Sequence, residues 1–137
     1  MHSIAKNLFQ DLKRAHASLE KAVILAEKQK NSEYSDTFQD SVIQRYEYTF
    51  ELSWKFLKKY LFETYGKETI YAKDTIKEAF RADLIDDMET WFDMVDTRNR
   101  LSHDYHEGYS QKSYERVSKE YTPTIAEMIR TIYRNIS

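Results

Sequence analysis

The stretch 36–65, DTFQDSVIQRYEYTFELSWKFLKKYLFETY, decides the fold of this chain. Apolar residues recur along it at steps of three and four, the spacing that places side chains on one face of an α-helix. The members of this stripe are Phe38, Val42, Tyr46, Phe50, Trp54, Leu57 and Leu61, and further aromatics lie off it at Tyr48, Phe56, Tyr60 and Phe62. A helix that is apolar over more than one face is central in a bundle or is also buried at an oligomer interface.

Helical periodicity continues on both sides of this stretch. It predicts a long helix over residues 3–30, a short one over 74–81, and two more over 86–108 and 113–135. Pro123 lies inside the last of these and should kink or interrupt it. The residues expected to face the core are Ile4, Leu8, Leu12, Ala15, Leu19, Ala22, Val23, Ala26, Ile76, Ala79, Phe80, Met88, Trp91, Phe92, Val95, Val117, Tyr121, Ile125, Met128, Ile129, Ile132 and Tyr133.

The composition agrees with an all-α fold. The chain has only 2 Gly and 1 Pro in 137 residues, whereas sheets and tight hairpins depend on such turn residues. Ser35 or Asp36 is expected to cap the second helix, and Gly66 is expected to end it. We therefore predict a single domain over residues 1–137, an antiparallel up-and-down bundle of four long helices plus one short helix.

Charge and residue types exclude several classes of function. With no cysteine, the chain cannot form disulfides, zinc–thiolate sites or a thiol nucleophile. It has no apolar run long enough to span a membrane, and its N-terminal residues do not resemble a signal peptide, so we expect a cytoplasmic protein. The net charge of −2 counts against a broad nucleic-acid-binding surface but leaves room for a small local site.

The segment 93–108, DMVDTRNRLSHDYHEG, carries the most chemistry. Helical steps from Trp91 and Val95 lead to Arg98, Asn99 and Ser102, so an apolar stripe turns polar near the expected helix end. Buried amide and guanidinium groups cost free energy unless they are paired, so such a break indicates a network, an interface or a site.

Three segments of the chain resemble HEPN proteins. Residues 98–105, RNRLSHDY, match the Arg-x4-His-x-Tyr signature of HEPN toxins, with a polar residue directly after the arginine. Residues 44–55, QRYEYTFELSWK, and 87–91, DMETW, resemble the branch of this family called nucleotidyltransferase substrate-binding proteins. The resemblance extends over residues 8–133, and the three segments occur in the family's order.

The resemblance implies a metal-independent ribonuclease that needs no cofactor. His103 would act as general base or acid while an RNA 2′-hydroxyl attacks the adjacent phosphate, and Arg98 would stabilise the developing charge. Asn99 would hold the histidine or the phosphate. Side chains expected to bind substrate or to support these groups are Glu47, Ser102 and Asp104.

The resemblance also implies a partner, a minimal nucleotidyltransferase on a separate chain. This enzyme would transfer AMP to Tyr105, and the bulky adenylate would block phosphate entry. Since Arg98 and His103 are five positions apart, they would point about 140° apart on one helix. A two-fold homodimer would bring two such segments together, and a hetero-oligomer with the partner is the alternative.

Two other functions remain open at this point. The chain could be a noncatalytic substrate-binding subunit of a two-chain nucleotidyltransferase, or a purely structural helical adaptor. No glycine-rich phosphate loop occurs, and the Gly-Ser and paired-aspartate elements of a nucleotidyltransferase are missing. Any nucleotidyl transfer must therefore come from another chain.

Several of these residues also have ordinary structural interpretations. Arg98 could pair with Asp93, Asp96 or Glu47. Glu47 and Glu51 lie four apart, but they lack further ligands at metal-binding spacing, so we expect no metal site. Pairing of Glu51 with Lys55 across one turn is the simpler interpretation. His2 and His16 are expected to be incidental.

Overall fold

The computed structural model describes residues 3–103 and 108–136, and all regular structure within them is helical. The elements are α1 (Ser3–Lys28), α2 (Ser35–Tyr65), α3 (Ala72–Arg81), α4 (Met88–His103), α5 (Gln111–Arg116), a π-helical segment η1 (Val117–Tyr121) and α6 (Thr122–Ile136). The last three follow one another without a break. Counted as one helix, they complete the predicted all-α bundle of four long helices and a short one, which is thereby confirmed. Among the described residues, no helix combines the length and the apolar character needed to cross a bilayer.

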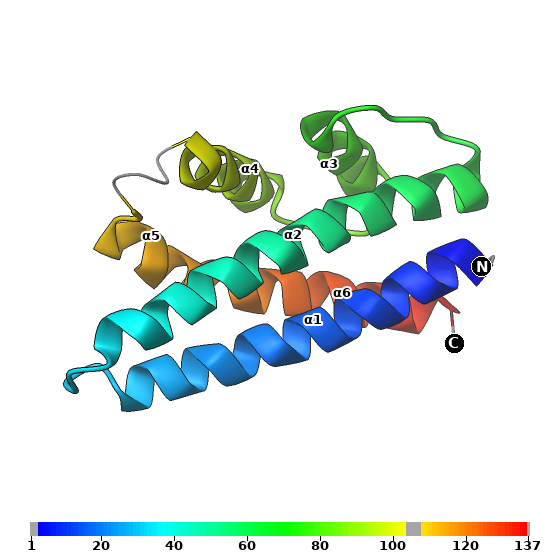
Figure 1. Ribbon diagram of the computed structural model, residues 1–137. Helices are drawn as coiled ribbons and strands as arrows, with labels where there is room; N and C mark the ends of the chain where they lie inside the picture. The colour runs from blue at the N-terminus through cyan, green and yellow to red at the C-terminus, as the bar shows by residue number, and fades with distance from the viewer. Residues whose placement is uncertain (1–2, 104–107, 137) are drawn as a thin grey trace.

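The helix α2 is the centre of the bundle. It runs alongside α1 in a long hairpin, with α6 on the same side as α1, while α3 and α4 lie on the opposite side and are seen more nearly end-on (Figure 1). Rings on α2 contact rings on three other elements at centroid distances of 5.2 Å (Phe9–Phe56), 5.5 Å (Tyr46–Tyr121) and 6.2 Å (Phe50–Trp91). These contacts explain why its sequence is apolar over more than one face.

Three residues predicted to face the core are exposed instead: Ile4, Phe80 and Tyr133. Each lies in the first or last turns of its helix, where fewer neighbouring elements remain to cover the apolar face. The Lys13 ammonium lies 5.8 Å from the centre of the Tyr133 ring. Periodicity places a residue on a face, but it does not say how far the neighbouring helix extends.

The ends of α2 confirm one prediction and correct another. Gly66 has φ of +66°, and its N–H donates to the carbonyl of Phe62 at 2.9 Å, so it ends the helix in the left-handed conformation that glycine favours. The prediction that Ser35 or Asp36 caps the start is wrong. Both lie inside the first turn, and Tyr34 occupies the capping position without a side-chain hydrogen bond.

The predicted disturbance at Pro123 takes the form of a π-helix. Proline lacks an N–H donor and its ring crowds the preceding turn, and the five residues Val117–Tyr121 adopt the wider winding just before it. The Thr122 hydroxyl donates to the carbonyl of Val117 at 2.8 Å. The Nε2 atom of buried His16 lies 2.8 Å from the Thr122 carbonyl oxygen, so the prediction that His16 is incidental is wrong.

Candidate functional site

Two buried polar contacts fix α4 against its neighbours just before the signature residues, and an exposed capping contact lies at its start. The Tyr46 hydroxyl on α2 donates to the carbonyl of Met94 at 2.8 Å, and the hydroxyls of Thr97 and Tyr121 lie 2.9 Å apart. The Asp87 carboxylate accepts from the Thr90 N–H at 3.0 Å at the start of the helix. These contacts hold the backbone from which Arg98 projects.

Arg98 is held on three sides and keeps 21 % of its side chain exposed. Its Nη1 forms an ion pair with a carboxylate oxygen of Glu51 on α2, and its Nε donates to the Asn99 side-chain oxygen at 3.0 Å. The centre of the guanidinium lies 5.6 Å from the Phe50 ring, within the range of a cation–π contact. A guanidinium has five N–H donors, so it retains donors for an incoming anion.

Arg98 pairs with Glu51 and not with Asp93, Asp96 or Glu47, the three partners that the sequence suggested. Asp93 instead accepts from Arg116 at 3.1 Å, and Asp96 pairs with Lys73 at 3.0 Å. Arg116 lies on α5 and Lys73 lies on α3, so neither of these pairs involves α2. The sequence pattern did not assign the pairing of Arg98 with Glu51, because spacing along the chain does not show which turn of α2 faces Arg98.

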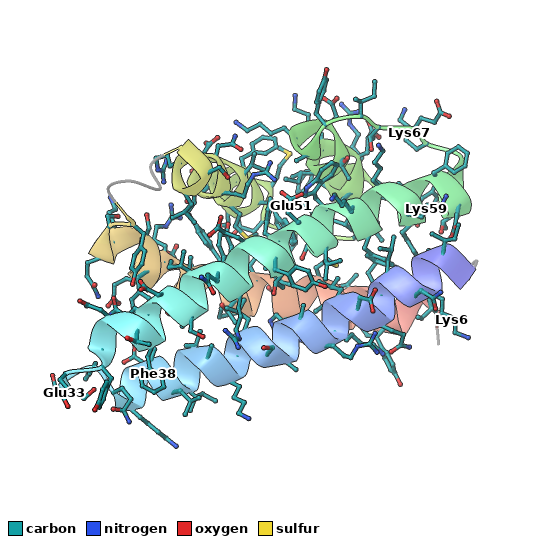
Figure 2. All side chains as sticks on the ribbon, viewed as in Figure 1. Lys6, Glu33, Phe38, Glu51, Lys59 and Lys67 are labelled. Atoms are coloured by element: carbon teal, nitrogen blue, oxygen red, sulfur yellow. The ribbon has the colours of Figure 1, made fainter. Side chains whose placement is uncertain are left out.

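Glu51 contacts the side chains of three other described residues at the site. Besides Arg98, its carboxylate contacts the Lys55 ammonium at 3.7 Å and accepts from the Trp54 indole N–H at 3.2 Å. Figure 2 shows Glu51 on the middle of α2, on the side that faces α4. The predicted pairing with Lys55 is confirmed but incomplete. The available signal for this role was the place of Glu51 between Phe50 and Trp54 in the segment 44–55.

Asn99 and Ser102 are exposed on α4. The Ser102 hydroxyl donates to the Arg98 carbonyl at 3.1 Å and is therefore engaged with its own helix. His103 is the last residue of α4. Asp104 and Tyr105 lie outside the described residues, so their roles stay predictions, as does that of His103.

Glu47 lies beside the signature segment in a shallow hollow of about 200 Å³. Partial burial raises the pKa of its carboxyl group, which favours the protonated form. Residues that line the hollow with it are Asp40, Ile43, Gln44, Leu101, Gly108 and Tyr109. Glu47 thus shares a hollow with Leu101 of the signature, but it is not the carboxylate that contacts Arg98, and its role in the site stays a prediction.

Tyr109 is a neighbour of the signature that the sequence pattern did not single out. Burial and a hydrogen bond with Asp40 raise the pKa of its phenol well above the usual range. It is one of eleven tyrosines, and its position just beyond the Arg-x4-His-x-Tyr segment was the only available signal. The phenol stays neutral at physiological pH and can donate a hydrogen bond.

The described side chains include no group of three or more His, Asp or Glu residues arranged to hold a metal ion. Glu47 and Glu51 line one shallow depression on α2 but are the only carboxylates among its lining residues, which are Gln44, Glu47, Tyr48, Glu51, Leu52 and Lys55. Arg98 can bind an anion here, because Glu51 and the Phe50 ring fix the orientation of its guanidinium.

Comparisons with known proteins agree with the signature. The family described as "Nucleotidyltransferase substrate binding protein like" matches residues 7–133. A curated relative from Haemophilus influenzae, described as a probable ribonuclease HepT, is 35 % identical over 86 residues. That alignment covers 60 % of this chain and 59 % of the relative, so it spans less than two thirds of either protein.

Solved structures share the fold over nearly the whole chain. A Haemophilus influenzae protein described as having the fold of a substrate binding domain of a nucleotidyltransferase is 27 % identical, with a TM-score of 0.74, covering 91 % of this chain and 98 % of that one. A protein from Thermus thermophilus is 30 % identical, with a TM-score of 0.59, over 86 % and 98 % of the two chains.

A more distant structure, the tri-AMPylated HEPN toxin of Shewanella oneidensis in complex with its MNT antitoxin, has a TM-score of 0.75 at 20 % identity. It covers 98 % of this chain and 99 % of that one. At this identity the likeness shows the fold alone.

Proposed function

This chain belongs to the nucleotidyltransferase substrate-binding proteins, the HepT-like branch of the HEPN family, and from that premise we propose that it is a metal-independent endoribonuclease of the HEPN toxin type. It acts as a single-domain cytoplasmic protein, and a separate minimal nucleotidyltransferase neutralises it by transferring AMP to Tyr105. The observation that carries the proposal is the oriented, partly exposed guanidinium of Arg98 in the family signature.

In the proposed reaction an RNA 2′-hydroxyl attacks the adjacent phosphorus and the bond to the 5′-oxygen breaks, which leaves a 2′,3′-cyclic phosphate and a 5′-hydroxyl. His103 takes the proton of the attacking hydroxyl or returns one to the leaving oxygen. Arg98 stabilises the charge on the phosphorane, for which a guanidinium fixed in advance is suited. Asn99, hydrogen-bonded to Arg98 at 3.0 Å, supports its orientation.

A homodimer supplies the geometry that one chain lacks. Arg98 and His103 are five positions apart in the sequence, and on an ideal helix that spacing corresponds to directions about 140° apart. Two copies of α4 related by a two-fold axis bring Arg98 of one protomer toward His103 of the other. The partner's transfer of AMP forms a bond from the Tyr105 phenolic oxygen to the α-phosphorus of ATP and releases pyrophosphate.

The test is growth on expression of the chain alone, together with cleavage of RNA by the purified protein in the presence of a chelator. Wild type should arrest growth and cleave RNA, whereas Arg98→Ala and His103→Ala should do neither. Arg100→Ala is the matched control, since it removes the same charge from an exposed position two residues away. Equal growth with wild type, Arg98→Ala and His103→Ala, with no cleavage by any of them, would falsify the proposal.

A second candidate is a noncatalytic substrate-binding subunit of a two-chain nucleotidyltransferase. It is favoured by the carboxylate of Glu51 on Arg98, which competes with a phosphate, and by the net charge of −2. This function predicts co-purification with the nucleotidyltransferase and AMP transfer to a molecule other than Tyr105. An unchanged transfer reaction with Tyr105→Phe, and no RNA cleavage by the chain, would favour it. Unaltered partner binding and activities with Arg98→Ala and His103→Ala would instead favour an adaptor.

A further inference from the structure

A second concave surface lies near the C-terminal end of α2. This groove has a volume of about 530 Å³ and lies between the start of α1, the last turns of α2 and the loop that leads to α3. Figure 2 shows Lys59 near the end of α2, with Lys67 on the chain that follows. The residues that line the lysine groove are Leu8, Lys55, Lys58, Lys59, Phe62, Glu68, Thr69 and Ile70.

The lysine groove is locally basic although the chain as a whole carries a charge of −2. Its lining residues include three lysines and the single carboxylate of Glu68. Lys55 is 3.7 Å from Glu51, and the Lys59 ammonium lies 5.9 Å from the centre of the Phe62 ring. Ammonium groups on flexible stems suit phosphates as point charges.

The same groove displays flat and apolar surface beside its charges. Phe62 is 47 % exposed and Ile70 is 68 % exposed. An exposed ring flanked by lysines has the two components of single-strand recognition, because bases stack on aromatic faces while cations follow the backbone. A duplex hides its base faces, so it cannot stack on Phe62 as an unpaired base can.

The lysine groove continues the surface of the Arg98 site. Glu51, Lys55 and Lys59 follow one another at four-residue steps on α2, so they share one face of that helix. Glu51 and Lys59 are separated by about 12 Å along the helix axis. Because Glu51 contacts both Arg98 and Lys55, a single strand can run from the arginine to the groove along a connected row of charged groups.

We propose that the lysine groove is an accessory binding site for single-stranded RNA that holds the strand flanking the phosphate at Arg98. The inference rests on the proposed ribonuclease function for its substrate, and it adds a site whose residues lie outside the signature. Lys58 and Lys59 bind phosphates and Phe62 stacks on a base.

The experiment measures binding by fluorescence anisotropy of the full-length protein to a labelled, single-stranded 2′-O-methyl oligoribonucleotide, which cannot be cleaved. Affinity is followed across a range of salt concentrations for wild type, Lys58→Gln/Lys59→Gln and Phe62→Ala. The control is Lys28→Gln/Lys30→Gln, which removes the same charge from exposed positions at the opposite end of the α1–α2 hairpin. Circular dichroism verifies that all variants are folded.

Loss of two phosphate contacts should weaken binding roughly tenfold or more at low salt and reduce the slope of log affinity against log salt by about 1.4, at about 0.7 for each contact. Phe62→Ala should weaken binding at least about fivefold, as expected for a lost stacking contact. The control pair should match wild type.

Three outcomes would overturn the inference. One is unchanged affinity and salt slope in Lys58→Gln/Lys59→Gln, and another is no binding of the probe by wild type. A third is loss of nucleotidyltransferase co-purification in the lysine variant with RNA binding intact, which would make the groove a protein interface. The ribonuclease proposal and the groove proposal can fail separately. If His103→Ala abolishes RNA cleavage while Lys58→Gln/Lys59→Gln leaves probe binding unchanged, the ribonuclease function is supported and the groove is not an RNA-binding site. If Lys58→Gln/Lys59→Gln loses probe binding but wild type cleaves no RNA, the groove binds RNA and the protein is not a ribonuclease.

Discussion

The hydroxyl of Tyr46 donates a hydrogen bond of 2.8 Å to the main-chain carbonyl of Met94, one turn before Arg98. Tyr46 is fully buried on α2 and its ring stacks with Tyr121 at 5.5 Å. Burial raises the pKa of its phenol, so the group remains a neutral donor at any physiological pH. This contact ties the backbone of the signature helix to the central helix of the bundle.

Replacing Tyr46 with Phe should lower the free energy of unfolding by about 1 kcal/mol, because one buried hydrogen bond is lost while the ring remains in place. The measurement is urea denaturation followed by circular dichroism. Tyr48→Phe is the control, since Tyr48 lies on the same helix and is 61 % exposed. Equal stability losses in the two variants would show that the contact with Met94 contributes nothing.

The ion pair between Arg98 and Glu51 should be measurable as a coupling energy. Both side chains are partly shielded, with 21 % and 33 % exposed, so we expect a coupling of about 1 kcal/mol, between the values of surface and buried pairs. The measurement is a double-mutant cycle with Arg98→Ala, Glu51→Ala and the double variant. Additive stability changes would show that the pair does not stabilise the fold.

Glu47 should make the fold less stable as pH rises. Its folded-state pKa is raised by burial, so between the unfolded and folded pKa values the folded protein binds more protons and stability falls with increasing pH. Glu47→Gln should therefore gain stability at pH 7 and gain nothing below about pH 4.3. Because the carboxyl is partly solvated, the gain should stay below about 1 kcal/mol.

The pKa shift of the exposed Glu115 carboxyl has the opposite sign to that of Glu47, so its effect on stability with pH should also be opposite. Hydrogen bonding to Lys119 lowers its pKa, so its contribution is present at neutral pH and is lost as pH falls through the folded pKa. Glu115→Gln should lose stability at pH 7 where Glu47→Gln gains it. Thermal unfolding of both variants between pH 3 and pH 8 measures the difference, and a shift of the same sign in both would contradict the burial argument.

Gly66→Ala should destabilise the protein by about 1 kcal/mol, because the φ of +66° is unfavourable for a side chain while the space beside the glycine is empty. Gly66→Asn should lose less, since asparagine tolerates the left-handed region. Chemical denaturation of both variants checks the order. If Gly66→Asn loses as much unfolding free energy as Gly66→Ala, the left-handed backbone conformation is not the cause of the loss.

The helices follow from the sequence because their signals are local. Steps of three and four residues gave the existence and extent of α1, α2 and α3, and a single glycine gave the end of α2. Pro123 marked a disturbance, but the π-helical segment before it was not predictable, since the choice between a kink and a wider turn depends on what packs against that turn. Buried His16, bonded to Thr122 from α1, illustrates this dependence.

The sequence by itself determined the helical class, the apolar faces of α2 and the family signature around Arg98, because periodicity and a short motif are properties of neighbouring positions. Only the tertiary structure decided that Arg98 pairs with Glu51, that Asp93 and Asp96 turn to other partners, and that lysines from α2 share a groove with Leu8 and Ile70. Those contacts depend on how the helices cross and where each one ends. Helix packing sets these features through the shapes of buried side chains, which no spacing along the chain specifies.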